Sequence, residues 1–528
     1  MASCTVHPTP MPRHFNTAGP CRPEIHYMLP AEARLPDLRE VIDQQAYFVL
    51  HAPRQVGKTT ALLALARSLT DEGRYASALV SMESGAAFAH DIGEAEAAVL
   101  ASWRLSAENT LPAELHPPPW PDAPPGARVR SALTAWARAC PRPLVVFLDE
   151  VDALHDAPLL AVLRQLRDGH THRPGSFPWS LALVGLRDVR DYKSASGGSE
   201  RLHTASPFNV KVASFTMRGF TLDDVGALYR QHTDDTGQLF TEEAIARTFE
   251  LTQGQPWLVN ALAYVCVGTL ARDRSVPITD ALIDRARDIL VERQDTHLDS
   301  LAERLREPRV RAVISPMLTG DALPPMPADD LRFSVDLGLV RETAPGVFEV
   351  ANPIYREIIA RDLAAPLRAA FPALTPTWLT AEGRVDWDRL RDAFIEFWVR
   401  HGEALLPGAP YPEAAPHLVL MAFLHRVVNG GGRVEREYAA GSGRMDLCVE
   451  YKGDRLGIEV KTWRDRDKRA DPARDALAQI DGYLARAGCV RGWVVVFDQR
   501  DGREALPERV RVERATTAGG RAVEVVRV

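Results

Sequence analysis

The chain has 528 residues, which is too long for one hydrophobic core and predicts about three or four domains. Hydrophobic residues make up 46% of it and charged residues 25%, close to average globular usage, which excludes a largely disordered or fibrous chain. The formal net charge of −7 excludes a polycation, so any nucleic-acid surface must be local.

Six cysteines are scattered along the chain without a C-x-x-C pair, which argues against a disulfide framework and against a zinc ribbon. Residues 1–20 lack the apolar core of a signal peptide, and no apolar run reaches the length of about 18 residues that a membrane span needs. We therefore expect a cytoplasmic protein without a membrane partner.

The first predicted elements are a strand, a tight turn and a helix. The apolar run AYFVLH at 46–51 predicts the strand, and leucine and alanine residues repeat at helical spacing after the turn. A further apolar run at 75–83 predicts the next parallel strand of a βαβ unit. The proline-dense stretch at 111–126 is expected to be an exposed insertion rather than an element.

The turn itself, APRQVGKTT at 52–60, has the residues of a phosphate-binding loop. Its backbone N–H groups can wrap a β-phosphate, Lys58 can reach the β- and γ-phosphate oxygens, and Thr59 can ligate Mg²⁺. Ala52 stands where this motif usually has its first glycine. The expected cofactors are therefore ATP and Mg²⁺. The residues expected to bind them here are Arg54, Gln55, Val56, Gly57, Lys58, Thr59 and Thr60.

Two further apolar runs, at 143–154 and 180–193, predict strands that are buried on both faces of a parallel sheet. In the first, the segment VVFLDE closes with Asp149, suited to orient Mg²⁺, and Glu150, suited to act as a base that polarises the attacking water. In the second, Arg187 follows LALVGL and is expected near the γ-phosphate, although an ordinary surface arginine fits this position equally well.

Together these motifs resemble the AAA-like, STAND-related P-loop ATPases. The resemblance rests on QVGKTT, the LDE strand end, GLRDVRDY and the later TQGQPWLVNAL, and it extends over roughly 14–365. It implies an ASCE-type parallel sheet (1–218), a helical lid (219–300) and a winged helix (301–365) that together form a nucleotide-driven switch. Two short strand-like runs, DLGLV and VFEVANP, fit the wing.

The resemblance also assigns residues outside the phosphate loop. In this class a Gly-x-Pro element of the lid contacts nucleotide, and Gly254 and Pro256 match it, although a plain helix break explains the same two residues. Tyr27 and Arg34 lie in a stretch that resembles the lead-in to the ATPase core of the family.

The last part of the chain, from about 385, begins with helices and then alternates strands with one helix. In the strand GIEVK, Glu459 and Lys461 point to one face, and a turn after the preceding strand would bring Asp446 beside Glu459. Paired carboxylates next to a lysine suit phosphodiester hydrolysis, in which the acids hold Mg²⁺ or Mn²⁺ and the lysine positions the nucleophile. A surface ion-pair cluster across a hairpin would show the same spacing.

This constellation resembles the PD-(D/E)XK nuclease superfamily, which implies an α/β nuclease domain within 366–528. Asp446, Glu459 and Lys461 match its core, with methionine in place of the proline that gives the motif its name. On the predicted helix at 475–488, Gln479 and Tyr483 match a Q-x-x-x-Y variant. Glu413 fits an additional upstream acid and metal ligand of that superfamily.

The stretch 461–475 follows this constellation and carries lysine and arginine residues around Trp463. Such a composition suits contact with a phosphate backbone, and its acids suit a solvated loop equally well.

These motifs lead to two competing hypotheses. The first is an ATP-hydrolysing, metal-dependent endonuclease with DNA as its nucleic-acid partner, which by resemblance implies defence against foreign DNA. The second is a nucleotide-switched signalling or scaffold ATPase whose winged helix and last domain only bind DNA or protein. A homo-oligomer, or a partner protein bound through the ATPase or winged-helix region, fits both hypotheses.

Overall fold

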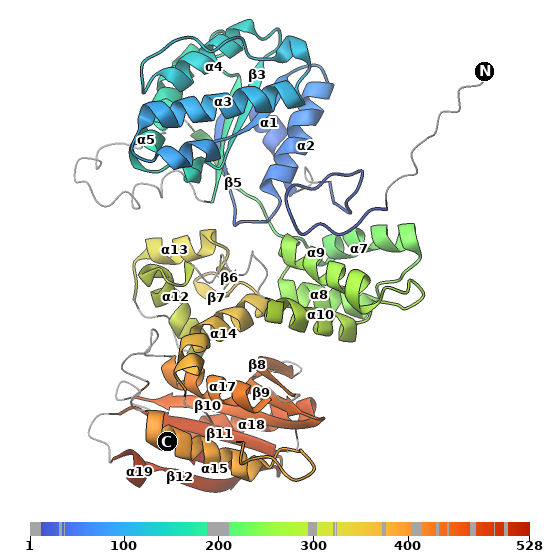
Figure 1. Ribbon diagram of the computed structural model, residues 1–528, viewed down its shortest axis with the longest axis vertical. Helices are drawn as coiled ribbons and strands as arrows, with labels where there is room; N and C mark the ends of the chain where they lie inside the picture. The colour runs from blue at the N-terminus through green and yellow to red at the C-terminus, as the bar shows by residue number, and fades with distance from the viewer. Residues whose placement is uncertain are drawn as a thin grey trace. The chain divides into compact units, whose positions relative to one another are not determined.

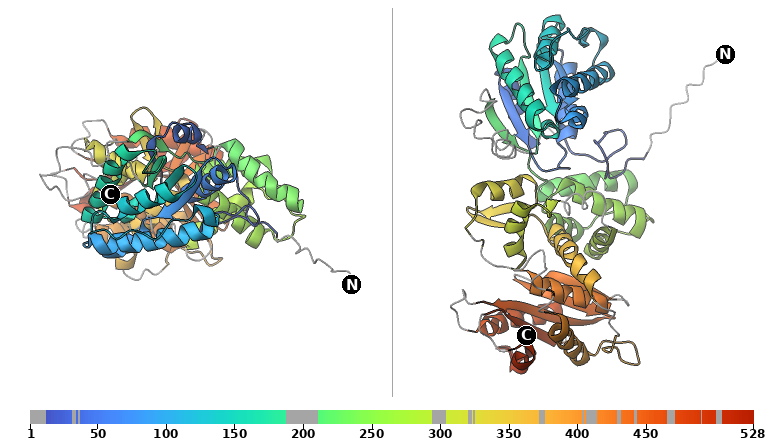
Figure 2. Two further views of the ribbon diagram at one scale, coloured as in Figure 1. Left: turned by 90° about the horizontal axis from the view of Figure 1, so that it is seen from above. Right: turned by 60° about the vertical axis from the view of Figure 1, so that its left-hand side comes forward.

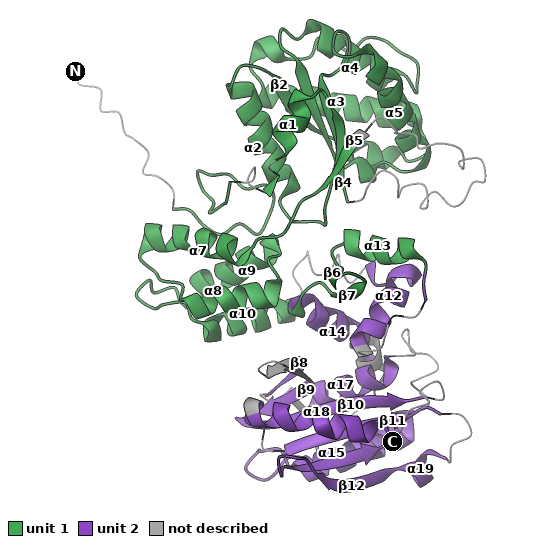
Figure 3. Ribbon diagram, turned by 180° about the vertical axis from the view of Figure 1, so that it is seen from behind, with its two compact units in different colours: residues 1–293, 327–353 green, residues 294–326, 354–528 purple. Residues whose placement is uncertain are grey.

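The computed structural model describes residues 12–30, 34–35, 37–186, 211–293, 304–319, 323, 325–371, 376–402, 405, 414–428, 432–440, 443–464, 471–489, 491–500 and 505–528. The chain forms two compact units (Figure 3). The first comprises Met1–Arg293 and Pro327–Pro353, and the second comprises Gln294–Met326 and Ile354–Val528.

A five-stranded parallel sheet forms the centre of the first unit. Its strands are β1 (Tyr47–His51), β2 (Ala76–Ser81), β3 (Leu144–Asp149), β4 (Ser180–Gly185) and β5 (Lys211–Thr216). Their order across the sheet is β2-β3-β4-β1-β5, and every neighbouring pair is parallel. The predicted parallel sheet is therefore confirmed, with β4 between β1 and β3.

Helices cover both faces of this sheet (Figures 1 and 2). On one face, α3 (Ile92–Thr110), α4 (Arg128–Ala139) and α5 (Asp156–Gly169) pack around Trp103 and Trp136. On the other face, α1 (Leu38–Asp43) and α2 (Lys58–Asp71) pack around Phe48 and Phe147. Alternate residues of each strand point into the two cores, which explains why the strands appear in the sequence as continuous apolar runs.

The proline-dense stretch at 111–126 is only partly exposed, which corrects the expectation of an exposed insertion. Leu115 is buried in the core of α3 and α4, and Trp120 packs against that core. The indole Nε1 of Trp136 donates to the carbonyl oxygen of Leu115 at 3.0 Å. The stretch also contains a short 3-10 helix, Ala113–Leu115, and its apolar side chains reach a core despite the prolines.

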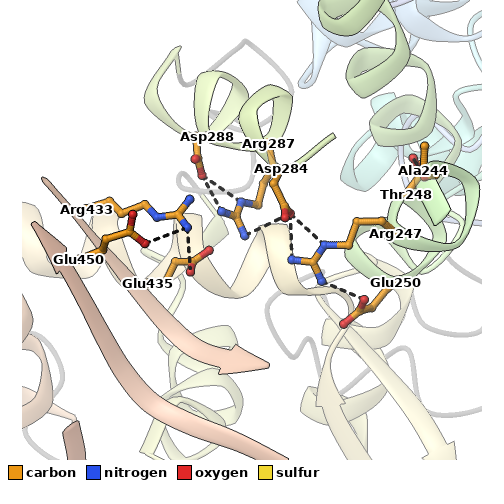
Figure 4. Close-up of polar contacts among 10 residues, drawn as sticks. All are labelled: Ala244, Arg247, Thr248, Glu250, Asp284, Arg287, Asp288, Arg433, Glu435 and Glu450. Atoms are coloured by element: carbon orange, nitrogen blue, oxygen red, sulfur yellow. Dashed lines mark hydrogen bonds and ion pairs between the residues drawn. The ribbon is translucent and has the colours of Figure 1, made fainter. Parts of the chain in front are cut away.

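Four α-helices follow the sheet within the described part of the first unit: α7 (Leu222–Thr236), α8 (Glu242–Thr252), α9 (Pro256–Val265) and α10 (Asp280–Arg293). Thr221, Thr241 and Gln255 cap the N-termini of the first three by accepting hydrogen bonds from backbone N–H groups. Arg247 of α8 pairs with Asp284 of α10 at 2.9 Å (Figure 4). The expected helical character of 219–300 is thus confirmed over the described residues.

An aromatic cluster anchors the lead-in segment, residues 12–30, to these helices. Phe15 contacts Tyr27, Tyr229 and Phe240, with ring centroids 4.9, 5.5 and 6.0 Å apart. The indole of Trp257 donates to the carbonyl oxygen of Thr17 at 2.8 Å. The lead-in segment is therefore fixed against the helical part of the first unit.

Residues 327–353 return to the first unit and contact both its loop and its helices. They form α13 (Ala328–Asp336) and a hairpin of β6 (Val340–Ala344) and β7 (Val347–Val350). A Cβ added at Gly338 would lie 2.6 Å from Cβ of Pro53, so the turn before β6 packs tightly on the phosphate loop. Arg341 donates to the side chain of Gln253 in the turn between α8 and α9.

The hairpin confirms the strand expected at VFEVANP, where β7 begins at Val347. The strand expected at DLGLV is displaced along the chain, because Asp336 ends α13, the next three residues form a turn, and β6 begins at Val340. The winged helix as a domain stays a prediction. Its remaining expected helices, α12 (Pro308–Thr319) and most of α14 (Pro353–Ala370), belong to the second compact unit.

A six-stranded sheet forms the centre of the second unit, in the order β12-β13-β11-β10-β9-β8. The strands are β8 (Gly432–Ala440), β9 (Gly443–Tyr451), β10 (Asp454–Trp463), β11 (Arg491–Asp498), β12 (Arg511–Thr516) and β13 (Ala522–Arg527). β8, β9 and β10 are antiparallel, whereas β10, β11 and β13 are parallel. On β8, Arg433 lies 3.4 Å from Glu450 of the neighbouring strand (Figure 4).

Two helical layers cover this second sheet. On one face, α18 (Pro472–Ala487) packs its buried residues Ile480 and Leu484 against Val494 and Val496. Against the other face, α15 (Trp387–Phe397), the short π-helix Trp398–Gly402 and α17 (Ala415–Val428) supply aromatic side chains, with Trp398 4.5 Å from Phe497. The remaining helix, α19 (Leu506–Arg509), is a single turn. In the described ranges of either unit, no helix is both long and apolar enough to cross a membrane.

Candidate functional site

The loop between β1 and α2 is folded around two residues with left-handed backbone. Gln55 has φ of 59° and Gly57 has φ of 91°, and Gly57 is the N-cap of α2. Such a conformation favours glycine at position 57, immediately before the helix begins at Lys58. The positive end of the α2 dipole therefore faces the loop, as a phosphate site requires.

Lys58 lies inside this loop. Its Nζ donates to the carbonyl oxygens of Ala52 and Pro53, at 2.6 and 2.8 Å. Burial lowers the pKa of Lys58 to about 8, while the carboxylates of Asp152 and Asp149 favour its charged form. The sequence motif did not single out Asp152, although it ends the acidic run DEVD.

Thr59 and Asp149 meet at the carboxyl edge of the sheet. The hydroxyl of Thr59 donates to Oδ2 of Asp149 at 2.8 Å, across the 90 residues that separate them in sequence. Asp149 is only 5% exposed, and burial raises the pKa of its carboxyl group. A buried carboxylate beside a hydroxyl at the end of a phosphate loop has the chemistry of a Mg²⁺ site.

Glu150 points to the neighbouring strand. The Ser81 hydroxyl, at the end of β2, donates to its carboxylate at 2.9 Å, and burial raises the pKa of Glu150. Ser81 was missed from sequence, because its position opposite Asp149 follows from the pairing of β2 with β3.

A cavity of about 280 Å³ opens beside the loop. It is lined by Gln55–Thr60 of the loop, by Asn16–Cys21, Tyr27, Met28, Leu29 and Arg34 from the segment before β1, and by Phe220, Leu228, Pro256, Trp257 and Asn260 from the helical part. The structure thus brings Tyr27, Arg34 and Pro256 together with the loop, whereas the exposed Arg54 is not among the lining residues.

Arg34 is the most buried cation at this cavity, at 8% exposed. Its Nε donates to the carbonyl oxygen of Arg218 at 3.1 Å, and its guanidinium lies 4.9 Å from the ring centroid of Phe220. Burial lowers the pKa of Arg34 to about 10. The group faces Gly57, where an added Cβ would lie 3.4 Å from Nη1.

Gly254 holds the turn between α8 and α9 close to the residues after β5. Its φ is 74°, and an added Cβ would lie 1.9 Å from the carbonyl oxygen of Phe220. The Phe220 N–H donates to the Gly254 carbonyl oxygen at 2.7 Å. This close approach brings Pro256 to the cavity.

A second cluster lies where β9 and β10 diverge. Their ladder ends at the pair Leu447–Ile458, one residue before Asp446 and Glu459 would meet. Oδ2 of Asp446 instead accepts a hydrogen bond from the N–H of Val460 at 2.7 Å. The two carboxylates therefore lie on adjacent strands at the same level of the sheet.

Glu459 and Lys461 form an ion pair at this point, in which the carboxylate is buried and the lysine is half-buried. Nζ of Lys461 lies 2.8 Å from Oε1 of Glu459, which is 3% exposed. Burial, followed by the charge of Asp446, raises the pKa of Glu459 to about 7. Burial opposes the charge of Lys461, but both carboxylates outweigh it and raise the pKa of the ammonium.

The helix α18 covers the same face of the sheet. Tyr483 is half-buried there, whereas Gln479 is exposed. The described residues include no group of three or more histidine, cysteine, aspartate or glutamate side chains suited to a metal ion. Oε2 of Glu459 is, however, buried without a hydrogen-bond partner, so the two carboxylates fit a divalent cation. Arg187 and Glu413 lie outside the described residues.

No family model matches the sequence, and a search for curated relatives gives no match. Among solved structures, the chain is similar to a Walker-type ATPase of Pyrococcus abyssi, with 14% identity over 65% of this chain and 99% of that chain and a TM-score of 0.46. It is also similar to the RuvB Holliday junction branch migration motor of Thermotoga maritima, with 13% identity, coverage of 60% and 90%, and a TM-score of 0.33. For the ORC1 protein of Aeropyrum pernix in complex with DNA, the identity is 15%, the coverage 65% and 95%, and the TM-score 0.33.

The class of the first unit rests on its own geometry. A parallel sheet with β4 between β1 and β3, and a phosphate loop between β1 and α2, define a P-loop ATPase core. The expected P-loop core is thereby confirmed at the level of the fold, and the PD-(D/E)XK assignment of the second unit stays a prediction.

Proposed function

We propose that the protein hydrolyses ATP at the phosphate loop of its first unit and phosphodiester bonds of DNA at the Asp446–Glu459–Lys461 cluster of its second. The proposal of ATP hydrolysis rests on the hydrogen bond of 2.8 Å from the Thr59 hydroxyl to the Asp149 carboxylate. The proposal of phosphodiester hydrolysis rests on the ion pair of Lys461 and Glu459, 2.8 Å apart, beside Asp446. The choice of DNA, and a role in defence against foreign DNA, rest on the resemblance of the sequence motifs.

At the phosphate loop, Lys58 would donate to β- and γ-phosphate oxygens, and loop N–H groups would wrap the β-phosphate. Thr59 and Asp149 would hold Mg²⁺, which supplies positive charge for the phosphate oxygens. Glu150 would orient the attacking water after its carboxylate leaves Ser81. The nucleoside part of ATP would occupy the cavity that Pro256 lines.

At the second cluster, Asp446 and Glu459 would hold Mg²⁺ or Mn²⁺, which supplies an activated water and positive charge at the scissile phosphate. Lys461 keeps its proton because two carboxylates face it, so it would donate to a phosphate oxygen. The hydrogen bond from Val460 N–H fixes the Asp446 carboxylate at the strand end. Tyr483 is half-buried on the helix that covers this face of the sheet and would help to orient Lys461.

Two lysine variants of the full chain separate the activities and serve as controls for each other. Lys58→Ala should lose ATP hydrolysis and retain metal-dependent cleavage measured without ATP. Lys461→Ala should lose cleavage of plasmid or oligonucleotide and retain ATP hydrolysis. Phosphate release and gel-based cleavage with Mg²⁺ or Mn²⁺, each with and without ATP, measure the two activities.

Each half of the proposal can fail separately. Undiminished phosphate release by Lys58→Ala would exclude the loop as the ATPase site. Equal cleavage by the wild type and Asp446→Ala across DNA and RNA substrates would exclude the second cluster as the nuclease site. Absence of cleavage in both proteins, together with DNA binding, would favour the scaffold ATPase.

A further inference from the structure

Trp463 lies on the same face of β10 as Lys461, at the end of the strand. Side chains two residues apart on a strand share a face and are separated by about 7 Å along it. In the parallel ladder with β11, Trp463 stands opposite Asp498 and Lys461 stands opposite Val496. Because the ladder of β9 with β10 ends at Ile458, Trp463 lies beyond the Asp446–Glu459 pair, in the part of β10 that pairs with β11.

A guanidinium group covers the ring of Trp463. The Cζ atom of Arg500 lies 3.5 Å from the ring centroid, which is a close cation–π contact. The same guanidinium makes two hydrogen bonds to Asp498, from Nε to Oδ1 at 2.9 Å and from Nη2 to Oδ2 at 2.7 Å. This fork holds the plane of Arg500 over the indole.

The backbone fixes the same arrangement. The N–H of Arg500 donates to Oδ1 of Asp498 at 3.1 Å, and the N–H of Gln499 donates to the carbonyl oxygen of Trp463 at 2.8 Å. Both planar groups are therefore held in place by the ends of β10 and β11. The Arg500 side chain remains 38% exposed and Trp463 is half-buried, so the stacked pair reaches solvent.

The neutralised charge of Arg500 disfavours a phosphate group as the ligand of the Trp463–Arg500 pair. Asp498 neutralises the guanidinium and has its own pKa lowered by it, which weakens attraction to a phosphate oxygen. Arg500 covers one face of the indole, and the indole packs against the core, so the outer plane of this nearly neutral guanidinium, supported by Trp463, is the surface that suits the π face of a nucleobase. Stacking on such a surface requires a base that is not paired inside a duplex.

We propose that Trp463 and Arg500 form a stacking site for an unpaired nucleobase of the nucleic acid that is cleaved at the Asp446–Glu459–Lys461 cluster. This inference rests on the proposed nuclease function. The separation of about 7 Å along β10 places the stacked base close to the scissile phosphate. The site therefore selects single-stranded nucleic acid, or a base extruded from a duplex, over a fully paired segment.

The test measures binding by the full chain without divalent metal, so that no cleavage occurs. Fluorescein-labelled oligothymidylate of about 12 nucleotides and the same backbone with abasic sites are titrated and followed by anisotropy. The wild type should bind the base-containing oligonucleotide roughly tenfold more tightly than the abasic one. Trp463→Leu should lose this difference and Trp463→Phe should keep most of it.

Arg500→Lys provides a second variant, which keeps the charge and loses the planar fork. It should reduce the preference for base-containing oligonucleotide severalfold while its circular-dichroism melting curve matches that of the wild type. Weakened duplex binding by Trp463→Leu would identify an extruded base as the source, and unchanged duplex binding would identify single strands. Both outcomes require the stacking site.

The inference is overturned if Trp463→Leu and Arg500→Lys discriminate against the abasic oligonucleotide as strongly as the wild type. It is also overturned if the wild type binds both oligonucleotides equally, because the bases then contribute nothing. Failure of the nuclease proposal has a different signature. In that case Mg²⁺ or Mn²⁺ gives no cleavage, whatever the anisotropy titrations show.

Discussion

Glu150 adopts a left-handed backbone conformation, with φ of 56°, at the point where β3 ends. Non-glycine residues rarely adopt this conformation, and it turns the carboxylate toward Ser81. The proposed base is therefore held by another side chain, at the neighbouring strand. A residue in this position can be positioned or withdrawn by one hydrogen bond.

We expect Ser81→Ala to raise the basal rate of ATP hydrolysis. Loss of a hydrogen bond worth about 1 kcal/mol would raise the fraction of Glu150 able to reach the water roughly fivefold. Steady-state phosphate release at saturating ATP measures the effect, and Glu150→Gln in the same background should abolish it. An unchanged rate would mean that Ser81 does not restrain Glu150.

Glu459 makes the second unit sensitive to pH. Because its pKa is raised to about 7, the folded carboxyl keeps a proton that the unfolded chain has already lost above its ordinary value of 4.5. The folded state then binds more protons than the unfolded state, so stability falls as pH rises from about 4.5 to about 7. We expect hydrogen exchange in β10 to report this fall in the wild type and to lose it in Glu459→Gln.

A divalent metal ion should restore the stability that the wild type loses as the pH rises. A cation held by Asp446 and Glu459 stabilises the ionised carboxylates, so Mn²⁺ added at about pH 7.5 should slow exchange in β10. Glu459→Gln should respond much less. The same response in both proteins would place the ion elsewhere.

At the scale of elements, two glycines in similar backbone conformations give a matched comparison. Gly237 ends α7 with φ of 75° and has nothing within 4 Å of an added Cβ, whereas at Gly254 that atom would meet the Phe220 carbonyl oxygen. We expect Gly237→Ala to cost about 1 kcal/mol through backbone strain alone. Gly254→Ala should cost about 3 kcal/mol, because strain and a clash combine.

Thermal unfolding and ATP titration distinguish the two variants. Gly254→Ala should also weaken ATP binding, since the turn it distorts carries Pro256 to the cavity. Gly237→Ala should leave ATP binding unchanged. Equal stability losses would show that the close approach at Phe220 relaxes at little cost.

Elements with strong local patterns could be predicted from sequence. The run LVVFLD predicts β3 because both faces of that strand are covered by helices. The expectation for 111–126 was wrong because proline content reports backbone irregularity and says nothing of where Leu115 packs. Ser81 was missed because its contact with Glu150 depends on strand order, which no local pattern encodes.

The second site shows the same division between local pattern and tertiary arrangement. The period of two along β10 places Glu459 and Lys461 on one face, and the hairpin brings Asp446 to the same level. Helical spacing puts Gln479 and Tyr483 on neighbouring turns, yet Tyr483 is half-buried and Gln479 is exposed. The rotation of α18 about its own axis decides this, and it is set by the packing of α18 against the sheet.

At the scale of the whole molecule, the first unit is assembled from two separate stretches of chain. Residues 327–353 contact its phosphate loop through Gly338 and its helical turn through Arg341. We expect a non-hydrolysable ATP analogue to slow hydrogen exchange in β6 as well as in α2, because nucleotide would immobilise both contact points. Unchanged exchange in β6 would mean that these contacts transmit nothing from the loop.

The polypeptide passes from one compact unit to the other after Arg293, after Met326 and after Pro353. Because the chain crosses between the two units three times, a signal from bound nucleotide has three covalent routes to the unit in which we propose cleavage.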